Sequence, residues 1–303
     1  MEEPDLVTVE IKVIPFISES IIRVVSRCPL PVLSALGDCA GSMLPLLDRR
    51  HRMLVRKRIQ RVFGDQYPAE ELTDRFYRHL GRLVFELPFV YRINSANVRD
   101  FFDTAAVERF RAELKKGKGL IILTGHLGNW ELTGASVSAC SIPVHAVAKK
   151  QKPAFFHRLL TRIRQRSGQR IIEKQGAFRK MVRLLRDNQA VALLMDHDVR
   201  KKGIFVPFLG IEASTLPTAA YLALLSGAPI MVACAFRTRN CRFRMHISGP
   251  LKWDAGINSD RDVAIQRIVR KINDHLGDFI RKQPDQWLWL QNRWKSTPDQ
   301  LRR

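Results

Sequence analysis

A short apolar run that ends in a glycine turn and continues as a helix, Gly117 to Cys140, constrains the fold of this 303-residue chain most strongly. Leu120 to Leu123 has the length and β-branched content of a strand, and Leu132 to Cys140 has the small and apolar residues of a packed helix. His126 is therefore expected in the turn at the carboxyl end of a strand, with Glu131 in the first turn of the helix. Open α/β sheets bind their ligands at that edge.

The rest of the chain alternates predicted strands with predicted helices. Strands are expected at 144–147, 170–172, 190–195, 205–208, 230–236 and 243–247. Helices are expected at 70–93, 108–116, 218–226 and 262–281, and one more on each side of Ser167 and Gly168. This alternation indicates an α/β fold, a single domain with a mixed, mostly parallel central sheet flanked by helices. We divide the chain into a helical N-terminal region, residues 1–100, and an α/β core, residues 101–303.

The N-terminal region joins an apolar segment to a basic one. Cys28 to Leu47 is twenty residues long with Asp38 as its only charge, but its three prolines argue against a straight spanning helix. Arg49 to Arg61 follows with seven Lys or Arg and no acid. This order is typical of an interfacial membrane anchor, although a core helix followed by a solvated basic helix gives the same pattern. We predict a membrane-associating region. Further along, Glu86 lies among apolar residues and is expected to be buried.

The net charge of +22 indicates a polyanionic partner: nucleic acid, an anionic membrane surface or an acidic substrate. Residues 149–186 alone carry 13 Lys or Arg against one acid, Glu173. A nucleic-acid-binding protein would lose affinity steeply with added salt. The sequence contains no recognised nucleic-acid-binding motif, so we predict no nucleic-acid partner.

His126 and Glu131 are the leading catalytic candidates. Histidine is the usual general base near neutral pH, and a nearby carboxylate would fix its tautomer and orient the ring. No Ser or Cys nucleophile stands beside them and no Gly-x-Ser-x-Gly motif occurs, so the base would activate a substrate hydroxyl for acyl transfer. The amides of Gly128 and Asn129 are expected to hold a phosphate or an oxyanion. A histidine and a glutamate that serve only as helix cap and surface residue would fit the same short motif.

Asp196, His197 and Asp198 end another predicted strand and could converge on the same edge. A metal site there would need a further ligand, and no His-x3-His motif accompanies them, so we predict no metal. We predict that Asp196 contacts the substrate. An acid that supports His126 is the alternative, and it is a simpler role than that of a metal ligand. Arg164 is a candidate for neutralising phosphate or sugar-acid groups.

Three motif blocks resemble one known family: GHLGNWE, then MDHDVRKKGIFVPFLGIEASTLPTAAYLALLSGAPI, then QPDQWLWLQNRWKSTP. From about Leu30 to the C-terminus, the chain resembles the bacterial lipid A late acyltransferases, the lauroyl and myristoyl transferases of the lysophospholipid acyltransferase-like superfamily. The blocks occur in the order that the family has. The three tryptophans of the last block are expected to pack in the core.

The resemblance implies an enzyme at the cytoplasmic face of the inner membrane. It would move a fatty acyl chain from acyl carrier protein to a hydroxyl of a lipid A precursor, with no cofactor besides acyl carrier protein or coenzyme A as the thioester co-substrate. His126 and Glu131 match the family's His-x4-acid motif, and Asp196 matches the acid of its Asp-Gln motif. Arg164 begins an Arg-x3-Gly pattern, which implies a place near the thioester or the acceptor.

The sequence departs from the family pattern in places that concern the acceptor. His197 stands where the family usually has Gln, and Gln291 and Asn292 stand in place of a usual His. Another glycolipid or a lipoamino acid is therefore an alternative acceptor. An acyl hydrolase that uses the same His and Glu to activate water is a second alternative.

Overall fold

A central sheet of six strands organises the protein. The computed structural model describes residues 19–148, 154–173, 175–238, 240–252 and 260–301. The strand order is β3 (Arg170–Glu173), β2 (Val144–Ala148), β4 (Ala190–Leu194), β1 (Leu120–Thr124), β7 (Ile230–Arg237) and β8 (Phe243–Ser248). Neighbouring strands are parallel, except that β8 runs antiparallel to β7. The predicted α/β fold with a mixed, mostly parallel sheet is confirmed.

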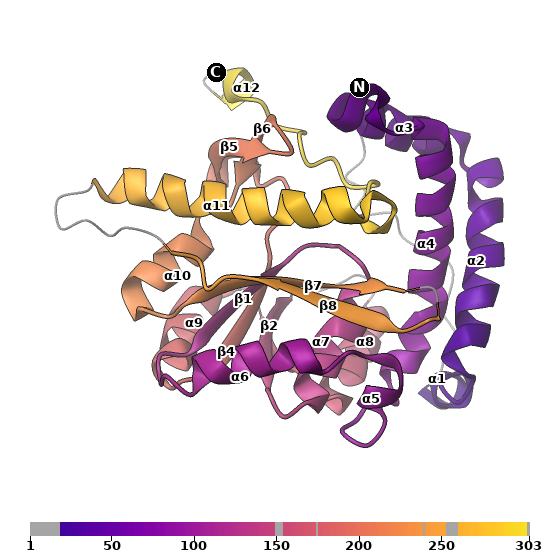
Figure 1. Cartoon of the computed structure of the whole chain (residues 1–303), viewed down its shortest axis with the longest axis horizontal. Helices are drawn as coiled ribbons and strands as arrows, with labels where there is room; N and C mark the ends of the chain where they lie inside the picture. The colour runs from indigo at the N-terminus through magenta and orange to yellow at the C-terminus, as the bar shows by residue number, and fades with distance from the viewer. Residues whose placement is uncertain (1–18, 149–153, 174, 239, 253–259, 302–303) are drawn as a thin grey trace.

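Helices cover both faces of this sheet, so its central strands are buried on both sides (Figure 1). One face carries α6 (Glu108–Leu114), α7 (Trp130–Ala139) and α8 (Ala154–Arg166), and the other carries α9 (Ala177–Arg186), α10 (Thr218–Ser226) and α11 (Arg261–Lys282). Along β1, Ile121 and Leu123 join one hydrophobic core and Leu120 and Ile122 join the other. A strand buried on both faces requires a continuous apolar run, which explains the sequence of β1.

A small antiparallel hairpin lies beyond α11. It consists of β5 (Ile204–Phe208) and β6 (Ile211–Thr215), and β5 packs against α11. The first strand was expected from the sequence, but the second strand was not. Polar residues such as Glu212 and Ser214 weaken its apolar pattern, and pairing with β5 stabilises it instead. The remaining short elements are η2 (Gly64–Gln66), η3 (Ala105–Val107), η4 (Arg200–Lys202), η5 (Pro284–Gln286) and α12 (Pro298–Leu301).

The N-terminal helices stand beside the sheet as a separate layer (Figure 1). They are α1 (Glu19–Val25), α2 (Leu30–Leu47), α3 (Arg49–Phe63) and α4 (Ala69–Val90), and the short α5 (Val98–Phe101) follows them in the chain. Glycines bring α2 and α4 into direct backbone contact, since a Cβ atom on Gly81 would lie 2.1 Å from the carbonyl oxygen of Gly37. We call these two helices the α2–α4 pair.

The prolines of the apolar segment do not interrupt it, contrary to the sequence-based expectation. Helix α2 is continuous over 18 residues. Pro31 lies in its first turn, where an amide hydrogen would have no helical partner, and Pro45 lies in its last turn. In the part of the chain that the structure describes, α2 is the one helix that length and composition would allow to cross a bilayer, with a mean hydropathy of 1.4.

Candidate active site

The turn between β1 and α7 has the predicted geometry: His126 follows the carboxyl end of β1, and Glu131 lies in the first turn of α7. Asn129 caps α7, because its side-chain oxygen accepts a hydrogen bond of 3.0 Å from the Leu132 amide. Only glycine fits at position 128, where φ is +60° and a Cβ atom would lie 1.9 Å from the carbonyl oxygen of Ala235.

Asp196 holds His126 through both its ring and its backbone. The Nδ1 atom of His126 lies 2.9 Å from Oδ1 of Asp196, and the His126 amide donates a 2.7 Å hydrogen bond to Oδ2. Strands β1 and β4 are neighbours and parallel, so their carboxyl ends bring these residues together. The side chain of Asp196 is 1% exposed and that of His126 is 15% exposed.

The C-terminal segment completes the surroundings of Asp196. Its Oδ2 atom also accepts hydrogen bonds from Trp287 Nε1 at 2.9 Å and Gln291 Nε2 at 2.8 Å. Burial alone would raise the pKa of Asp196, but His126, His197 and Trp287 hold that pKa well below its usual range. An ionised carboxylate only accepts hydrogen bonds, so Nδ1 of His126 carries the ring proton and Nε2 is left to accept one.

Glu131 does not orient His126 in this structure, which corrects the role expected from the motif. Its carboxylate forms a two-point ion pair with Arg164 of α8, with Nε to Oε2 at 2.8 Å and Nη2 to Oε1 at 2.5 Å. Burial would raise the pKa of Glu131, but Arg164 outweighs burial and lowers it. The reason lies in the packing of α7 against α8, which aims Glu131 at the neighbouring helix.

The backbone donor expected at Gly128 is also already in use. The Gly128 amide donates a 2.8 Å hydrogen bond to the carbonyl oxygen of Gln286 in η5, so it cannot bind substrate as placed. The Asn129 side chain is buried. Asp196, expected to contact substrate, contacts His126 instead, as its alternative reading predicted. Among the described residues, no three His, Cys, Asp or Glu side chains form a group that could hold a metal ion.

Two aromatic rings contact the imidazole edge to face: Trp130 at 4.9 Å and His197 at 4.5 Å between ring centroids. Sequence reasoning missed the roles of Trp287 and Gln291. Both lie in the C-terminal motif block, which marked the segment as important, but tryptophan was read only as a core residue. Trp287 is indeed fully buried, and its indole N–H is the part that reaches Asp196.

Comparison with known proteins identifies the family of the chain. The family model described as bacterial lipid A biosynthesis acyltransferase matches residues 5–296. The chain belongs to this family. It is therefore an acyltransferase of the lipid A and glycolipid type.

Curated relatives align over most of their length with this acyltransferase. The lipid A biosynthesis palmitoleoyltransferase of Escherichia coli is 26% identical over 90% of this chain and 88% of its own. The lipid A biosynthesis lauroyltransferase of the same organism is 20% identical over 92% and 90%. The phosphatidylinositol mannoside acyltransferase of Mycolicibacterium smegmatis is 24% identical over 79% and 78%.

A second histidine, His79 of α4, is buried beside the backbone of Gly128 in this acyltransferase. Burial, Arg237 and Arg82 lower the pKa of His79 to about 3. The folded-state pKa is thus below the unfolded-state value of about 6.5. The folded protein keeps His79 neutral, whereas the unfolded chain takes up a proton as the pH falls below 6.5. The stability that His79 contributes is complete above that pH and is lost on acidification.

We predict that wild type loses about 1.4 kcal/mol more unfolding free energy than His79→Leu when the pH falls from about 7.5 to about 5.5. Leucine has a similar volume and no titratable group, so the difference isolates His79. Urea unfolding of both proteins at the two pH values measures it. An equal loss in both would contradict a neutral, buried His79.

Proposed function

We propose that this acyltransferase moves a fatty acyl chain from the thioester of acyl carrier protein to a hydroxyl of a lipid A precursor, with His126 as the general base. The observation that carries this proposal is the hydrogen bond between His126 and the buried, ionised Asp196. It leaves Nε2 of a partly exposed imidazole as the proton acceptor.

In the proposed reaction, Nε2 of His126 takes the proton of the acceptor hydroxyl as the hydroxyl oxygen attacks the thioester carbonyl. The Asp196 carboxylate stabilises the imidazolium that forms. When the tetrahedral intermediate collapses, the carbon–sulfur bond breaks and the imidazolium returns the proton to the leaving thiolate. An ester and a free thiol result, and no cofactor or covalent enzyme intermediate is required.

The developing oxyanion needs a positive environment. We assign it to the amino end of α7, where the helix dipole is positive, and to the Asn129 amide rather than that of Gly128. Arg164 is 20% exposed beyond its ion pair with Glu131, and we place it near the thioester or a phosphate of the acceptor. The Glu131 carboxylate then positions Arg164 rather than His126.

The relatives bear on the acceptor. The two Escherichia coli relatives are named for lipid A biosynthesis, and the Mycolicibacterium smegmatis relative is named for phosphatidylinositol mannoside. The family and the longer alignments favour a lipid A precursor. A different glycolipid or a lipoamino acid is the alternative, since His197 beside His126 departs from the family pattern. Offering each acceptor class to the purified enzyme separates them.

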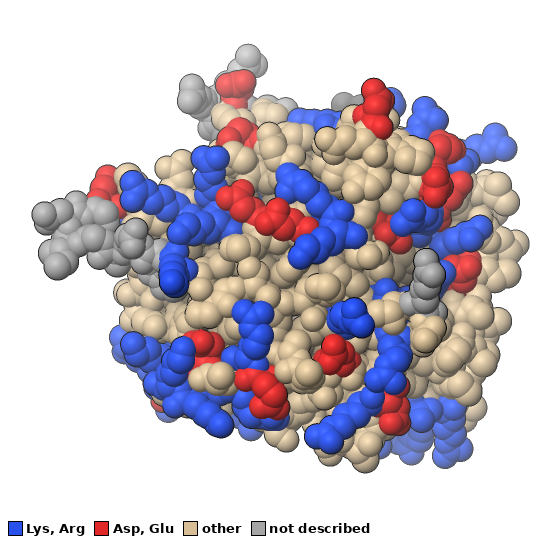
Figure 2. Space-filling view, in the orientation of Figure 1, with Lys and Arg blue, Asp and Glu red and all other residues tan. Residues whose placement is uncertain are grey.

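The surface charge supports an acidic thioester donor. Figure 2 shows Lys and Arg side chains spread over one face of the molecule, with fewer acidic side chains among them. Helices α8 and α9 also expose cations, including Arg158, Arg162, Arg179, Arg183 and Arg186. Such a field would raise the association rate of an acidic carrier protein and make it sensitive to salt.

Replacing His126 with alanine should reduce acyl transfer by about 10²- to 10⁴-fold without unfolding the protein, because the base is lost and the fold is not. Acyl carrier protein that bears a labelled acyl chain is incubated with the enzyme, with and without a lipid A precursor. Labelled lipid and labelled free fatty acid are both counted. Near-wild-type transfer by His126→Ala would contradict the assignment. Equal acyl release without acceptor would favour a hydrolase.

We also propose that the enzyme lies on the cytoplasmic face of the inner membrane through α2. The side of α2 that faces away from α4 exposes apolar residues at helical spacing: Val32, Leu36, Met43, Leu46 and Leu47, from 46% to 83% exposed. The only charged residue of α2, Asp38, forms an ion pair with Arg82 of α4. Helix α3 then exposes the cations Arg49, Arg50, Arg56, Lys57 and Arg61, which suit anionic headgroups.

This helix is proposed to lie in the interface rather than to span the bilayer. Its glycine contact binds it to α4, and α4 exposes Glu71, Asp74 and Arg78 to solvent. Charged side chains of that kind are costly in hydrocarbon, so the α2–α4 pair cannot enter the hydrocarbon as a unit. An in-plane helix buries only its apolar side.

Leu36→Glu with Met43→Glu should lower binding to anionic vesicles at least about tenfold, because each change removes the burial of a large apolar side chain. Co-sedimentation with phosphatidylethanolamine and phosphatidylglycerol vesicles measures the bound fraction. The matched control is Leu225→Glu with Val263→Glu, at similarly exposed apolar positions on α10 and α11. Equal losses in both pairs would contradict a membrane contact through α2.

A further inference from the structure

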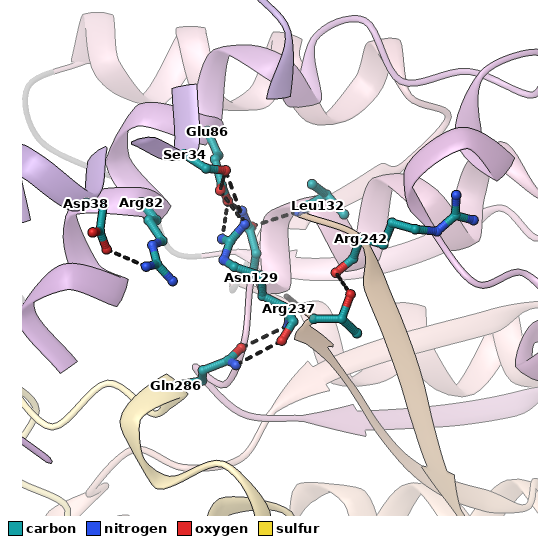
Figure 3. A network of polar contacts seen from close by, with 10 residues as sticks. Ser34, Asp38, Arg82, Glu86, Asn129, Leu132, Arg237, Arg242 and Gln286 are labelled. Atoms are coloured by element: carbon teal, nitrogen blue, oxygen red, sulfur yellow. Dashed lines mark hydrogen bonds and ion pairs between the residues drawn. The ribbon is translucent and has the colours of Figure 1, made fainter. Parts of the chain in front are cut away.

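A closed ring of buried polar contacts lies behind the His126 turn. Figure 3 shows the part of it that runs from Asn129 through Glu86 and Arg237 to Gln286. We propose that this ring, through Glu86 of α4, positions the turn for the acyl transfer proposed above, on which the proposal rests. Glu86 and its partners touch neither His126 Nε2 nor Asp196, so they are positioning residues. No motif marked Glu86 as functional, although its apolar surroundings predicted its burial.

Five residues close the ring, and every link between them is a direct contact. Asn129 Nδ2 donates a 2.9 Å hydrogen bond to Glu86 Oε2, and the Glu86 carboxylate pairs with both terminal nitrogens of Arg237. The Arg237 backbone exchanges two hydrogen bonds with the Gln286 side chain, at 3.0 and 3.3 Å. The Gln286 carbonyl accepts from the Gly128 amide at 2.8 Å, which returns to the residue before Asn129.

The ring fixes both halves of the turn. Asn129 caps α7 with its side-chain oxygen and contacts Glu86 with its side-chain nitrogen, so Glu86 determines which way the amide faces. On the other half, the Leu288 amide donates a 3.0 Å hydrogen bond to the carbonyl oxygen of His126. The backbone that carries the imidazole is thereby held from α4 and from the C-terminal segment.

Stability alone does not account for a charged pair at this place. The Glu86 side chain is fully buried and that of Arg237 is 5% exposed. Desolvation of such a pair offsets its attraction, and apolar residues of similar volume are often at least as stabilising. A buried polar network whose members bond one another, however, specifies one arrangement of those members. Within the ring, Arg237 Nε is the one buried side-chain atom that has no hydrogen-bond partner. Ser34 of α2 adds to it with a 2.5 Å hydrogen bond to Glu86 Oε1.

Two double variants separate positioning from folding. Glu86→Gln with Arg237→Met removes both charges and keeps an amide oxygen for Asn129. Glu86→Leu with Arg237→Met removes both charges and the acceptor as well. We expect the Leu variant to have a kcat about 10- to 100-fold lower than the Gln variant, with KM for the acyl donor unchanged, because small displacements of catalytic groups carry large penalties.

Hydrogen exchange of the amides from 126 to 133 is measured on the same proteins and requires no activity. Exchange should be faster in the Leu variant than in the Gln variant and wild type. Asp38→Asn is the control, since it breaks the ion pair between Asp38 of α2 and Arg82 of α4, which lies outside the ring (Figure 3). It should change neither kcat nor exchange at the turn.

Equal exchange and equal kcat in the two double variants would overturn the role of Glu86. If wild type itself transfers no acyl chain in the presence of acceptor, the proposed function fails, and the exchange result alone decides whether the ring holds the turn. Unchanged exchange in the Leu variant would then overturn the ring.

Discussion

The buried carboxylate of Asp196 is the interaction on which the arrangement of the site depends. An isolated ionised carboxylate in a protein interior is costly, so its position must supply donors. Here they come from the β1 turn through His126 and from the C-terminal segment through Trp287 and Gln291. Three segments that are distant in sequence therefore have to meet at one side chain. The geometry around His126 and the C-terminal segment are thus parts of one structure.

The division of the two carboxylates follows from helix packing. Glu131 lies only five residues from His126, yet α7 directs it toward Arg164 on α8. Asp196 lies 70 residues away and is adjacent in space because β4 neighbours β1. Asp196 thereby contacts the proposed base, His126, and Glu131 contacts the neighbouring cation, Arg164. The α2–α4 pair supplies Glu86 to the β1–α7 turn from the side that faces the core, while the side of α2 that faces away from α4 remains apolar.

Much of this was predictable from local pattern. The strand at Leu120, the position of His126 at its end and the burial of Glu86 follow from periodicity and apolar surroundings, which adjacent residues determine. The partner of Glu131 was not predictable, since it depends on how α7 and α8 pack. The Gly128 amide was misjudged for a similar reason: its acceptor, Gln286, is a distant residue of a 3-10 turn. Proline content also misled, because Pro31 lies in the first turn of α2, which needs no amide hydrogen, and Pro45 lies inside the helix without ending it.

The location of the ring proton of His126 tests the central claim most directly. Three N–H donors hold an oxygen at the Oδ2 position of residue 196, so in Asp196→Asn the amide nitrogen must face His126 Nδ1 and donate to it. Nitrogen–proton correlation spectra of isotope-labelled histidine should place the proton on Nδ1 in wild type and in Glu131→Gln, and on Nε2 in Asp196→Asn. A proton that stays on Nδ1 in Asp196→Asn and moves in Glu131→Gln would contradict the account.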